Sequence, residues 1–429
     1  MNGSLKALAV TALTLGMLPG LAKAELVVEI TRGAEAALPI AVADFGDHGE
    51  ALPEDMAGII RDNLLRSGQF DPLPREEFID NPTRSDDVRF ENWRALGVDS
   101  LVVGEGRRNG PDYQIRFELL DVFTGERLIG RSFNAFRPAL RSLAHVISDS
   151  IYEELLGRPG AFNTRVAYVA IDEQGDEREF QLIVADADGH DPQSILTSPE
   201  PLLSPAWSPD RERLAYVSFE DRRSEIYVQD IGTGERQNVA SFRGLNSAPA
   251  WSPDGTRLAV TLSRDGQTDI YALDIDSGET TRITDHYAID TEAAWSPDGE
   301  SLYFTSDRGG SPQIYRVNAD GGNVQRITYE GNYNASPDIS PNGDQLAMIH
   351  RSDNGFRVAV QDLERHRFRI LSEGPHDESP SFAPNGDMVV YATRQNGVGV
   401  LGTVSLYGEA RNIMATEGLT LREPAWSPD

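Results

Sequence analysis

The chain has 429 residues, of which 39% are hydrophobic and 25% charged; this composition fits a globular protein of two or three domains and excludes both a polytopic membrane protein and a disordered chain. Lys and Arg number 39 against 68 Asp and Glu, a formal net charge of −29, which repels phosphate backbones and excludes sequence-independent nucleic-acid binding. Cysteine is absent, which excludes a disulfide framework, a thiolate nucleophile and a Cys-ligated zinc site.

Residues 1–24 have the pattern of a cleaved export signal. Lys6 precedes an uncharged, largely apolar stretch that ends in Ala22-Lys23-Ala24, an A-x-A cleavage motif. The stretch is short for a membrane span, and Cys is not available for a lipid anchor. We therefore expect cleavage between Ala24 and Glu25, and a mature periplasmic chain without a transmembrane segment.

Lysine occurs only at Lys6 and Lys23, so the mature chain has Arg as its only permanent cation. An acidic surface without lysine fits a host living in salty water, where screening mutes repulsion between like charges. It fits equally a GC-rich genome that favours Arg codons. The composition leaves both explanations open.

Residues 25–160 lack any repeat and alternate between strand and helix patterns, which predicts a separate α/β domain. The expected strands are Leu26–Ile30, Ile40–Phe45, Ser100–Val103, Tyr113–Val122 and Arg127–Asn134, and the expected helices are Glu54–Ser67, Phe90–Leu96 and Pro138–Leu156. The last helix has one apolar stripe, which we interpret as core and not as a cofactor site. Gly157-Arg-Pro-Gly160 is the predicted hinge to the second domain.

One phrase recurs through the second half of the chain at intervals of 44, 44, 44, 43 and 44 residues, and periods of this length indicate propellers or solenoids. Its six copies are Trp207-Ser-Pro-Asp, Trp251-Ser-Pro-Asp-Gly, Trp295-Ser-Pro-Asp-Gly, Ile339-Ser-Pro-Asn-Gly, Phe382-Ala-Pro-Asn-Gly and Trp426-Ser-Pro-Asp. Short β-branched runs separated by Asp/Gly/Ser turns lie between the copies, and helical repeats would need longer runs of period 3.6. Residues 161–429 are therefore expected to form an all-β six-bladed β-propeller.

The last copy of the phrase ends the chain and lacks following strands of its own. Its partners are expected to be Arg165–Ile171, Phe180–Asp186 and Gln193–Thr197, so that the C-terminal strand closes the first blade. The Ser-Pro-Asp-Gly segments are interpreted as structural turns and not as catalytic aspartates. Ile339 and Phe382, which replace Trp, are expected to be packing substitutions.

The longer connections before each Trp-like residue are expected to surround the mouth of the propeller channel, where binding functions concentrate. Catalytic motifs such as Gly-x-Ser-x-Gly, Gly-x-x-x-x-Gly-Lys and His-Glu-x-x-His are absent from the sequence. The histidines are scattered, and the segment 186–191 lacks the bidentate Glu of a calcium loop, since Thr197 stands at the twelfth position. We expect no enzyme activity, no cofactor and no metal site.

These features together resemble the TolB family, whose members are periplasmic components of the Tol-Pal envelope system. The resemblance spans the whole mature chain: the export signal, a small α/β domain and six Trp-Ser-Pro-Asp-Gly blades ending in Pro-Ala-Trp-Ser-Pro. Further supporting phrases start at Leu38 (LPIAVADF), Thr305 (TSDRGGSPQIY), Gln325 (QRITYEG) and Pro384 (PNGDMVVY).

The resemblance implies a protein-interaction adaptor and not an enzyme. Family members bind the peptidoglycan-associated lipoprotein, Pal, at the channel mouth and TolA through the mature N-terminal segment, and they support outer-membrane integrity and cell division. Other outer-membrane lipoproteins and colicins are further candidate partners, with the chain a monomer within the complex. The alternative is a hydrolase or lyase that binds or processes a small ligand in its channel; against it, no hydrolase domain follows Asp429.

Carried onto this sequence, the resemblance places the N-terminal switch segment at Glu25, Leu26, Val27, Val28, Glu29, Ile30, Thr31, Arg32 and Gly33. It places the Pal-binding rim at Asn246, Ala248, Thr291, Glu292, Asn334, Ala335, Asp377 and Glu378. Glu292 is the strongest single candidate, because a carboxylate in a partly desolvated centre can accept hydrogen bonds from backbone or Arg donors.

Overall fold

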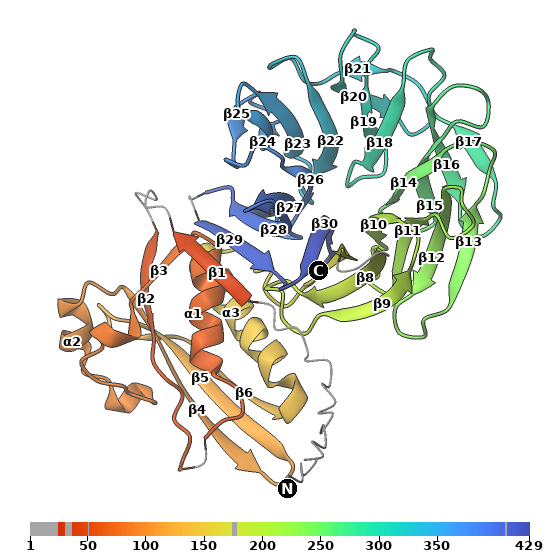
Figure 1. Ribbon diagram of the computed structural model, residues 1–429. Coiled ribbons are helices and arrows are strands. Elements are labelled where there is room, and N and C mark those ends of the chain that lie inside the picture. The colour runs from red at the N-terminus through yellow and green to blue at the C-terminus, as the bar shows by residue number, and fades with distance from the viewer. Residues whose placement is uncertain (1–24, 31–36, 50, 174–177, 408–409) are drawn as a thin grey trace, which may run out of the picture.

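The computed structural model describes residues 25–30, 37–49, 51–173, 178–407 and 410–429, which form an α/β domain beside a β-propeller (Figure 1). The predicted export signal with Ala22 and Ala24, and the residues Thr31, Arg32 and Gly33 of the predicted switch segment, lie outside the described residues. Within the described part of the chain, no helix has the length and apolar character needed to cross a membrane.

The N-terminal domain is a mixed five-stranded sheet in the order β3-β2-β4-β5-β6. Its strands are β2 (Leu38–Val42), β3 (Phe70–Pro72), β4 (Ser100–Asn109), β5 (Asp112–Asp121) and β6 (Arg127–Phe136). Strand β2 runs parallel to β3 and β4, whereas β4, β5 and β6 are antiparallel to one another. The hairpin between β4 and β5 is longer than the sequence predicted, because Gly104 and Gly106 continue the strand instead of ending it.

Among the described residues there are three α-helices, and two of them cover one face of this sheet. The helices are α1 (Met56–Arg66), α2 (Phe90–Ala95) and α3 (Leu140–Leu156). Asp55 caps α1 by accepting the N–H of Gly58 at 2.9 Å, and Gly157 ends α3 in the left-handed conformation, which glycine adopts without a Cβ clash. Apolar side chains of α1 and α3 share one buried cluster with the facing residues of β5, among them Ile115 and Phe117.

The described residues of the second domain form six sheets of four propeller strands each. Blade one contains β30 (Leu419–Trp426), β7 (Arg165–Asp172), β8 (Glu179–Asp186) and β9 (Gln193–Ser198); blade two contains β10 (Leu202–Trp207), β11 (Arg213–Ser218), β12 (Glu225–Asp230) and β13 (Arg236–Ala240). Blade three contains β14 (Asn246–Trp251), β15 (Arg257–Leu262), β16 (Asp269–Asp274) and β17 (Thr280–Arg282); blade four contains β18 (Asp290–Trp295), β19 (Ser301–Ser306), β20 (Gln313–Asn318) and β21 (Gln325–Arg326). Blade five contains β22 (Asn334–Ile339), β23 (Gln345–Ser352), β24 (Gly355–Asp362) and β25 (Phe368–Ile370); blade six contains β26 (Glu378–Phe382), β27 (Met388–Gln395), β28 (Val398–Ser405) and β29 (Ala410–Ala415).

The C-terminal strand closes the ring, as the sequence predicted. Strand β30 pairs antiparallel with β7, with Leu419 opposite Asp172 and Trp426 opposite Val166. A strand from the far end of the chain thus completes the first blade, and the ring leaves no inner edge open.

Strand β1 (Glu25–Ile30) is an additional, fifth strand at the outer edge of blade six. It pairs antiparallel with β29, with Glu25 opposite Ala415 and Ile30 opposite Ala410. The sequence predicted a strand at 26–30 but not this partner. The start of the described chain therefore lies against the propeller, although its sequence neighbours belong to the other domain (Figure 1).

The repeated phrase links neighbouring blades and forms turns, as the sequence predicted. Each of three indoles donates its N–H to a carbonyl of the preceding blade: Trp207 to Ala425 at 3.0 Å, Trp251 to Ala206 at 3.1 Å, and Trp295 to Ala250 at 3.2 Å. In the turn after Trp251, Asp254 accepts hydrogen bonds from Ser252 and Thr256, and these lower the pKa of its carboxyl to about 2. The carboxylates of such aspartates accept hydrogen bonds within their own turns, so they are not available for catalysis.

A polar contact and a buried ion-pair cluster join the two domains. Tyr152 of α3 and Arg158 both donate hydrogen bonds to Asp387, in the turn between β26 and β27. Nearby, Arg141 of α3 donates to Asp188, which lies in the turn between β8 and β9. The N-terminal domain is thus held against the turns of blades six and one.

Candidate interaction surface at the propeller mouth

Six residues, one from each innermost strand, encircle the propeller channel near its mouth, and we call them the channel ring. Each has a positive φ between 48° and 54° and lies where a β-bulge shifts the register of its strand: Ser204, Ala248, Glu292, Ser336, Ser379 and Glu423. With the residue that follows each of them, Pro in all but one, they line a cavity of about 160 Å³. Non-glycine residues in this conformation are strained and cluster at functional sites.

Two carboxylates of the channel ring bind the backbone of the next blade. Glu292 accepts hydrogen bonds from the N–H and hydroxyl of Ser336, both at 3.1 Å, and from the hydroxyl of Thr305 at 2.9 Å. Glu423 accepts the N–H of Ser204 in the same way, and burial raises the pKa of this carboxyl. These carboxylates fix the bulges of neighbouring blades relative to one another. Glu292 remains partly exposed and keeps unused lone pairs on its oxygens.

The structure separates the predicted rim residues into two groups. Ala248, Thr291, Glu292 and Glu378 are partly exposed around the mouth. Glu378 also pairs with Arg422 of the neighbouring strand through two hydrogen bonds of 2.7 and 3.0 Å, the fork geometry in which guanidinium binds carboxylate most strongly.

The other predicted rim side chains are buried. Asn246, Asn334 and Asp377 have exposed fractions of 0%, 0% and 2%, and Ala335 has 4%. The Asn246 amide donates to the carbonyls of Ser224, Phe242 and Gly244 and accepts the N–H of Phe242.

Asn334 and Asp377 are held inside their blades in the same way. Asn334 donates to the Glu330 carbonyl and pairs with His350, and Asp377 accepts the hydroxyls of Ser372 and Thr393. These side chains shape the connections at the mouth from inside. Asp377 also lines a cavity beside the channel ring.

Three exposed apolar side chains lie in the connections that lead to β14 and β18, and the sequence did not single them out as binding residues. Leu245 is 39% exposed, Ile289 is 55% exposed and Tyr287 is 79% exposed. Their signal was present in the sequence, because each lies one to three residues before an innermost strand. Large apolar side chains beside a polar centre are the usual anchors of a protein interface.

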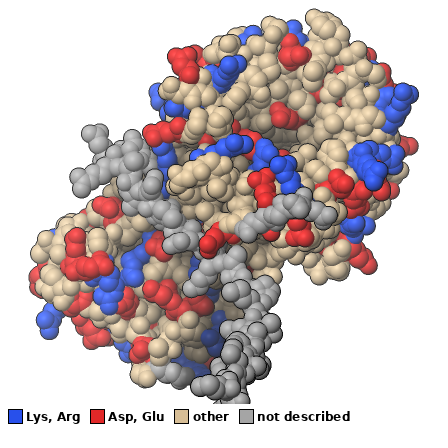
Figure 2. Space-filling view, in the orientation of Figure 1, with Lys and Arg blue, Asp and Glu red and all other residues tan. Residues whose placement is uncertain are grey.

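A second cavity, of about 520 Å³, adjoins the channel ring on the side of blades five and six. It is lined by Tyr333, Phe356, His376 and Arg394 together with ring residues. Arginines and carboxylates are interspersed over the visible propeller face, and no single sign of charge dominates it (Figure 2). The mouth therefore combines hollows, apolar anchors and paired charges.

One group of potential metal ligands occurs among the described residues, at the junction of the domains and far from the mouth. It contains His145, Asp186 and Asp188. Arg141 donates to Asp188 and lies 3.8 Å from Asp186, so a guanidinium already supplies positive charge there. Burial lowers the pKa of His145 to about 4. The group fits an ion-pair network better than a cation site.

Comparison with known proteins gives a consistent result over the whole described chain. The TolB amino-terminal domain family matches residues 26–128, and the TolB beta propeller domain family matches residues 152–429. The Tol-Pal system protein TolB of Alkalilimnicola ehrlichii is 54% identical over 94% of this chain and 95% of its own, and that of Nitrosococcus oceani is 58% identical over 94% of both chains. The crystal structure of TolB from Acinetobacter baumannii superposes with a TM-score of 0.87 at 38% identity, covering 95% of this chain and all of that one.

Proposed function

The chain belongs to the TolB family and is a component of the Tol-Pal system, not an enzyme; from this premise we propose that it is a periplasmic adaptor. Its mouth binds the soluble domain of the peptidoglycan-associated lipoprotein, Pal, and its N-terminal segment, Glu25 to Gly33, binds TolA. Through these two contacts the protein supports outer-membrane integrity and constriction during division. Residues 1–24 direct its export and are removed.

The observation that carries the Pal assignment is the composition of the mouth. Leu245, Tyr287 and Ile289 supply exposed apolar area beside the channel ring. Glu292, with its unused lone pairs, and the paired Glu378 supply hydrogen-bond acceptors near the centre. A desolvated polar centre with aromatic and aliphatic anchors next to it is the arrangement in which a few residues carry most of the binding energy.

The arrangement of β1 supports the TolA assignment. This strand has a single neighbour, β29, and lies at the outer edge of blade six. An edge strand held on one side exchanges its backbone hydrogen bonds more readily than a central strand. When the segment leaves this edge, its backbone can form hydrogen bonds with another protein. An order-to-disorder change of a segment is an established type of conformational switch.

Calorimetric titration of residues 25–429 with the soluble domain of the host's own Pal tests the proposal. Tyr287→Ala and Glu292→Ala are the variants at the mouth, and Tyr329→Ala is the matched control, since Tyr329 is 72% exposed and lines a different part of the propeller. Binding that is weakened at least tenfold by Tyr287→Ala, about 1.4 kcal/mol, and unchanged by Tyr329→Ala supports the proposal. No binding at any salt concentration contradicts it and favours a small ligand in the channel.

A further inference from the structure

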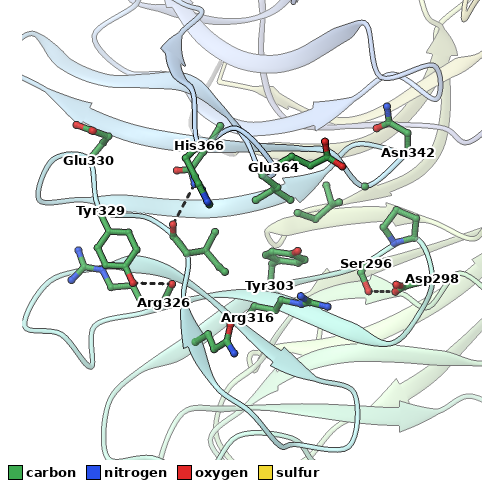
Figure 3. A pocket seen from close by; sticks show the side chains of 17 residues that line it. Ser296, Asp298, Tyr303, Arg316, Arg326, Tyr329, Glu330, Asn342, Glu364 and His366 are labelled. Atoms are coloured by element: carbon green, nitrogen blue, oxygen red, sulfur yellow. Dashed lines mark hydrogen bonds between the residues drawn. The ribbon is translucent and has the colours of Figure 1, made fainter.

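A groove of about 840 Å³ lies between blades four and five, apart from the channel mouth. Figure 3 shows Tyr329 and Glu330 at one end of this groove, Ser296, Asp298 and Asn342 at the other, and Tyr303 and Arg316 between them. The walls come from the strands and turns of both blades. Its volume exceeds those of the two cavities at the channel mouth, which are about 520 and 160 Å³.

The groove exists because the repeat is broken here. At the two preceding blade junctions an Arg guanidinium lies over the indole of the next blade: Arg213 is 4.7 Å from the ring of Trp251, and Arg257 is 4.9 Å from that of Trp295. At the junction of blades four and five, Ser301 and Ile339 stand at these positions. The outer strand β21 is also only two residues long, so less of the junction is covered than elsewhere.

Several polar groups in the groove have no partner among the residues that the structure describes. Arg316 forms no ion pair or hydrogen bond there and its Nε is shielded from solvent, although its charge helps to lower the pKa of Asp298 and its guanidinium lies 5.9 Å from the centre of the Tyr303 ring. The Tyr303 hydroxyl, next to it, is likewise unpaired. Gln361 donates to the carbonyl of Ile327 at 3.3 Å, which leaves its side-chain oxygen free. Burying the Arg316 Nε without a partner costs free energy, which a polar ligand would recover.

A flat aromatic surface completes the groove at its outer end. Tyr329 is 72% exposed, and the Arg326 guanidinium lies 4.9 Å from the centre of its ring. The Tyr329 hydroxyl donates to the carbonyl of Arg326 at 3.2 Å, so the ring is held in a fixed orientation. An exposed tyrosine that is held in place in this way presents a rigid apolar face at little entropic cost.

We propose that this groove binds an acidic oligosaccharide, with a sugar ring stacked on Tyr329 and a carboxylate on Arg316. Sugars expose apolar C–H faces and hydroxyl edges in alternation, which match an aromatic ring flanked by planar amide, guanidinium and carboxylate side chains. The unpaired guanidinium selects a negatively charged sugar, because guanidinium binds carboxylate through two parallel hydrogen bonds. The lining offers tyrosine rings and planar polar groups but no deep apolar pocket of the kind that peptide side chains fill.

The test compares two soluble disaccharides that differ in one carboxylate. The first joins N-acetylglucosamine to N-acetylmuramic acid, and the second is chitobiose, which lacks the lactyl carboxylate. Each is titrated into residues 25–429 by calorimetry, with a free acidic tetrapeptide as a third ligand. We expect the carboxylated disaccharide to bind at least tenfold more tightly than chitobiose and than the tetrapeptide, about the effect of one charge-assisted hydrogen bond.

Variants locate the site. Arg316→Gln is expected to abolish the preference for the carboxylated sugar, and Tyr329→Ala to weaken both sugars at least tenfold. Tyr287→Ala is the matched control, because Tyr287 is also an exposed tyrosine but lies at the channel mouth; it should leave both affinities unchanged. Absence of sugar binding, equal binding of the two sugars, tighter binding of the tetrapeptide, or binding that is indifferent to Arg316 and Tyr329 would each overturn the proposal. The failure of this proposal is distinguishable from a failure of Pal binding, which is tested separately through Tyr287→Ala, and the groove shares no lining residue with the two cavities at the mouth.

Discussion

Ile339 and Tyr303 reverse the sizes of a residue pair that recurs at three other junctions of the ring. At three other junctions the residue that begins the Ser-Pro phrase is Trp and shares its core cluster with an alanine of the preceding blade: Trp207 with Ala167, Trp251 with Ala215, and Trp295 with Ala259. At the junction of blades four and five the small partner is Ile339 and the large one is Tyr303, again within one cluster. The two substitutions therefore compensate each other in volume.

Exchanging this pair tests the compensation. Tyr303→Ala should lower the free energy of unfolding by about 3 kcal/mol, because Tyr303 is only 7% exposed and its removal leaves a cavity. Ile339→Trp alone should cost about 1–3 kcal/mol through overpacking against Tyr303. The double variant restores the Trp–Ala pair and should cost at least 1 kcal/mol less than the sum of the single changes. Urea denaturation of all four proteins measures this, and strict additivity would show that the two side chains are independent.

Asp338 is expected to make stability fall as the pH rises. Its position in the innermost strand is occupied by Ala or Ser in the other blades. Burial raises the pKa of its carboxyl from 3.8 to about 6, and the N–H of Phe382, at 2.6 Å, opposes this only in part. The native state therefore holds a proton that the unfolded chain has lost, so stability declines between about pH 4 and pH 6.

Asp338→Asn isolates this effect, because the amide oxygen can still accept the N–H of Phe382. We expect the variant to be more stable than the parent above pH 6, by on the order of 2 kcal/mol, and this gain to vanish near pH 4. Melting temperatures of both proteins from pH 4 to pH 8 give the difference directly. A difference that stays constant over that range would contradict the buried-acid explanation.

His145 is expected to act in the opposite direction, at the junction of the domains. Burial lowers the pKa of its imidazole from 6.5 to about 4, against the attraction of Asp188. The unfolded chain therefore binds a proton that the native state excludes, and stability is lost as the pH falls from about 6.5 to about 4. His145→Gln keeps a polar side chain near Asn63 but does not titrate. Its melting temperature should depend less on pH in this window, and an unchanged dependence would exclude His145 as the cause.

Repulsion within the acidic surface gives a prediction about salt. Residues 25–429 lack both lysines, so 37 Arg against 68 Asp and Glu give a net charge of −31, and the compact state is destabilised by like charges that salt screens over about 10 Å at 0.1 M. We expect the melting temperature of residues 25–429 to hold or rise between low and molar sodium chloride. A steep loss would mean that ion pairs such as that of Arg422 with Glu378 stabilise the fold more than general repulsion weakens it.

The features of the fold that could be predicted from the sequence are those encoded locally. The Trp-Ser-Pro-Asp-Gly phrase specifies its turn within five residues, and its regular spacing predicts the blades and their closure by β30. The pairing of β1 with β29 could not be predicted, because it joins segments separated by most of the chain. Strand β3 was missed because Phe70–Pro72 is too short to show a period.

The candidate site was only partly predictable for a related reason. The position of each innermost strand at the mouth could be predicted correctly from its place before each Trp. A β-bulge in each strand, however, determines which side chains face the channel. Asn246 and Asn334 lie two residues before the bulge and are buried, whereas Glu292 lies at the bulge and faces the channel. No propensity predicts a left-handed Glu or Ser at such a position.

The role of Glu292 can be separated into a structural part and a binding part. Glu292→Gln keeps an acceptor for the N–H of Ser336, which lies 3.1 Å from the present carboxylate, and removes only the charge. Glu292→Ala leaves the Thr305 hydroxyl oxygen, 3.0 Å away, as the acceptor of that N–H, and the loss of the carboxylate should lower the free energy of unfolding by about 1 kcal/mol. If Glu292 contacts Pal through its charge, calorimetry should show both variants weakened alike, although only the alanine variant is destabilised. If Pal binding falls only in the alanine variant, Glu292 positions the bulge of blade five for the partner and does not itself contact it.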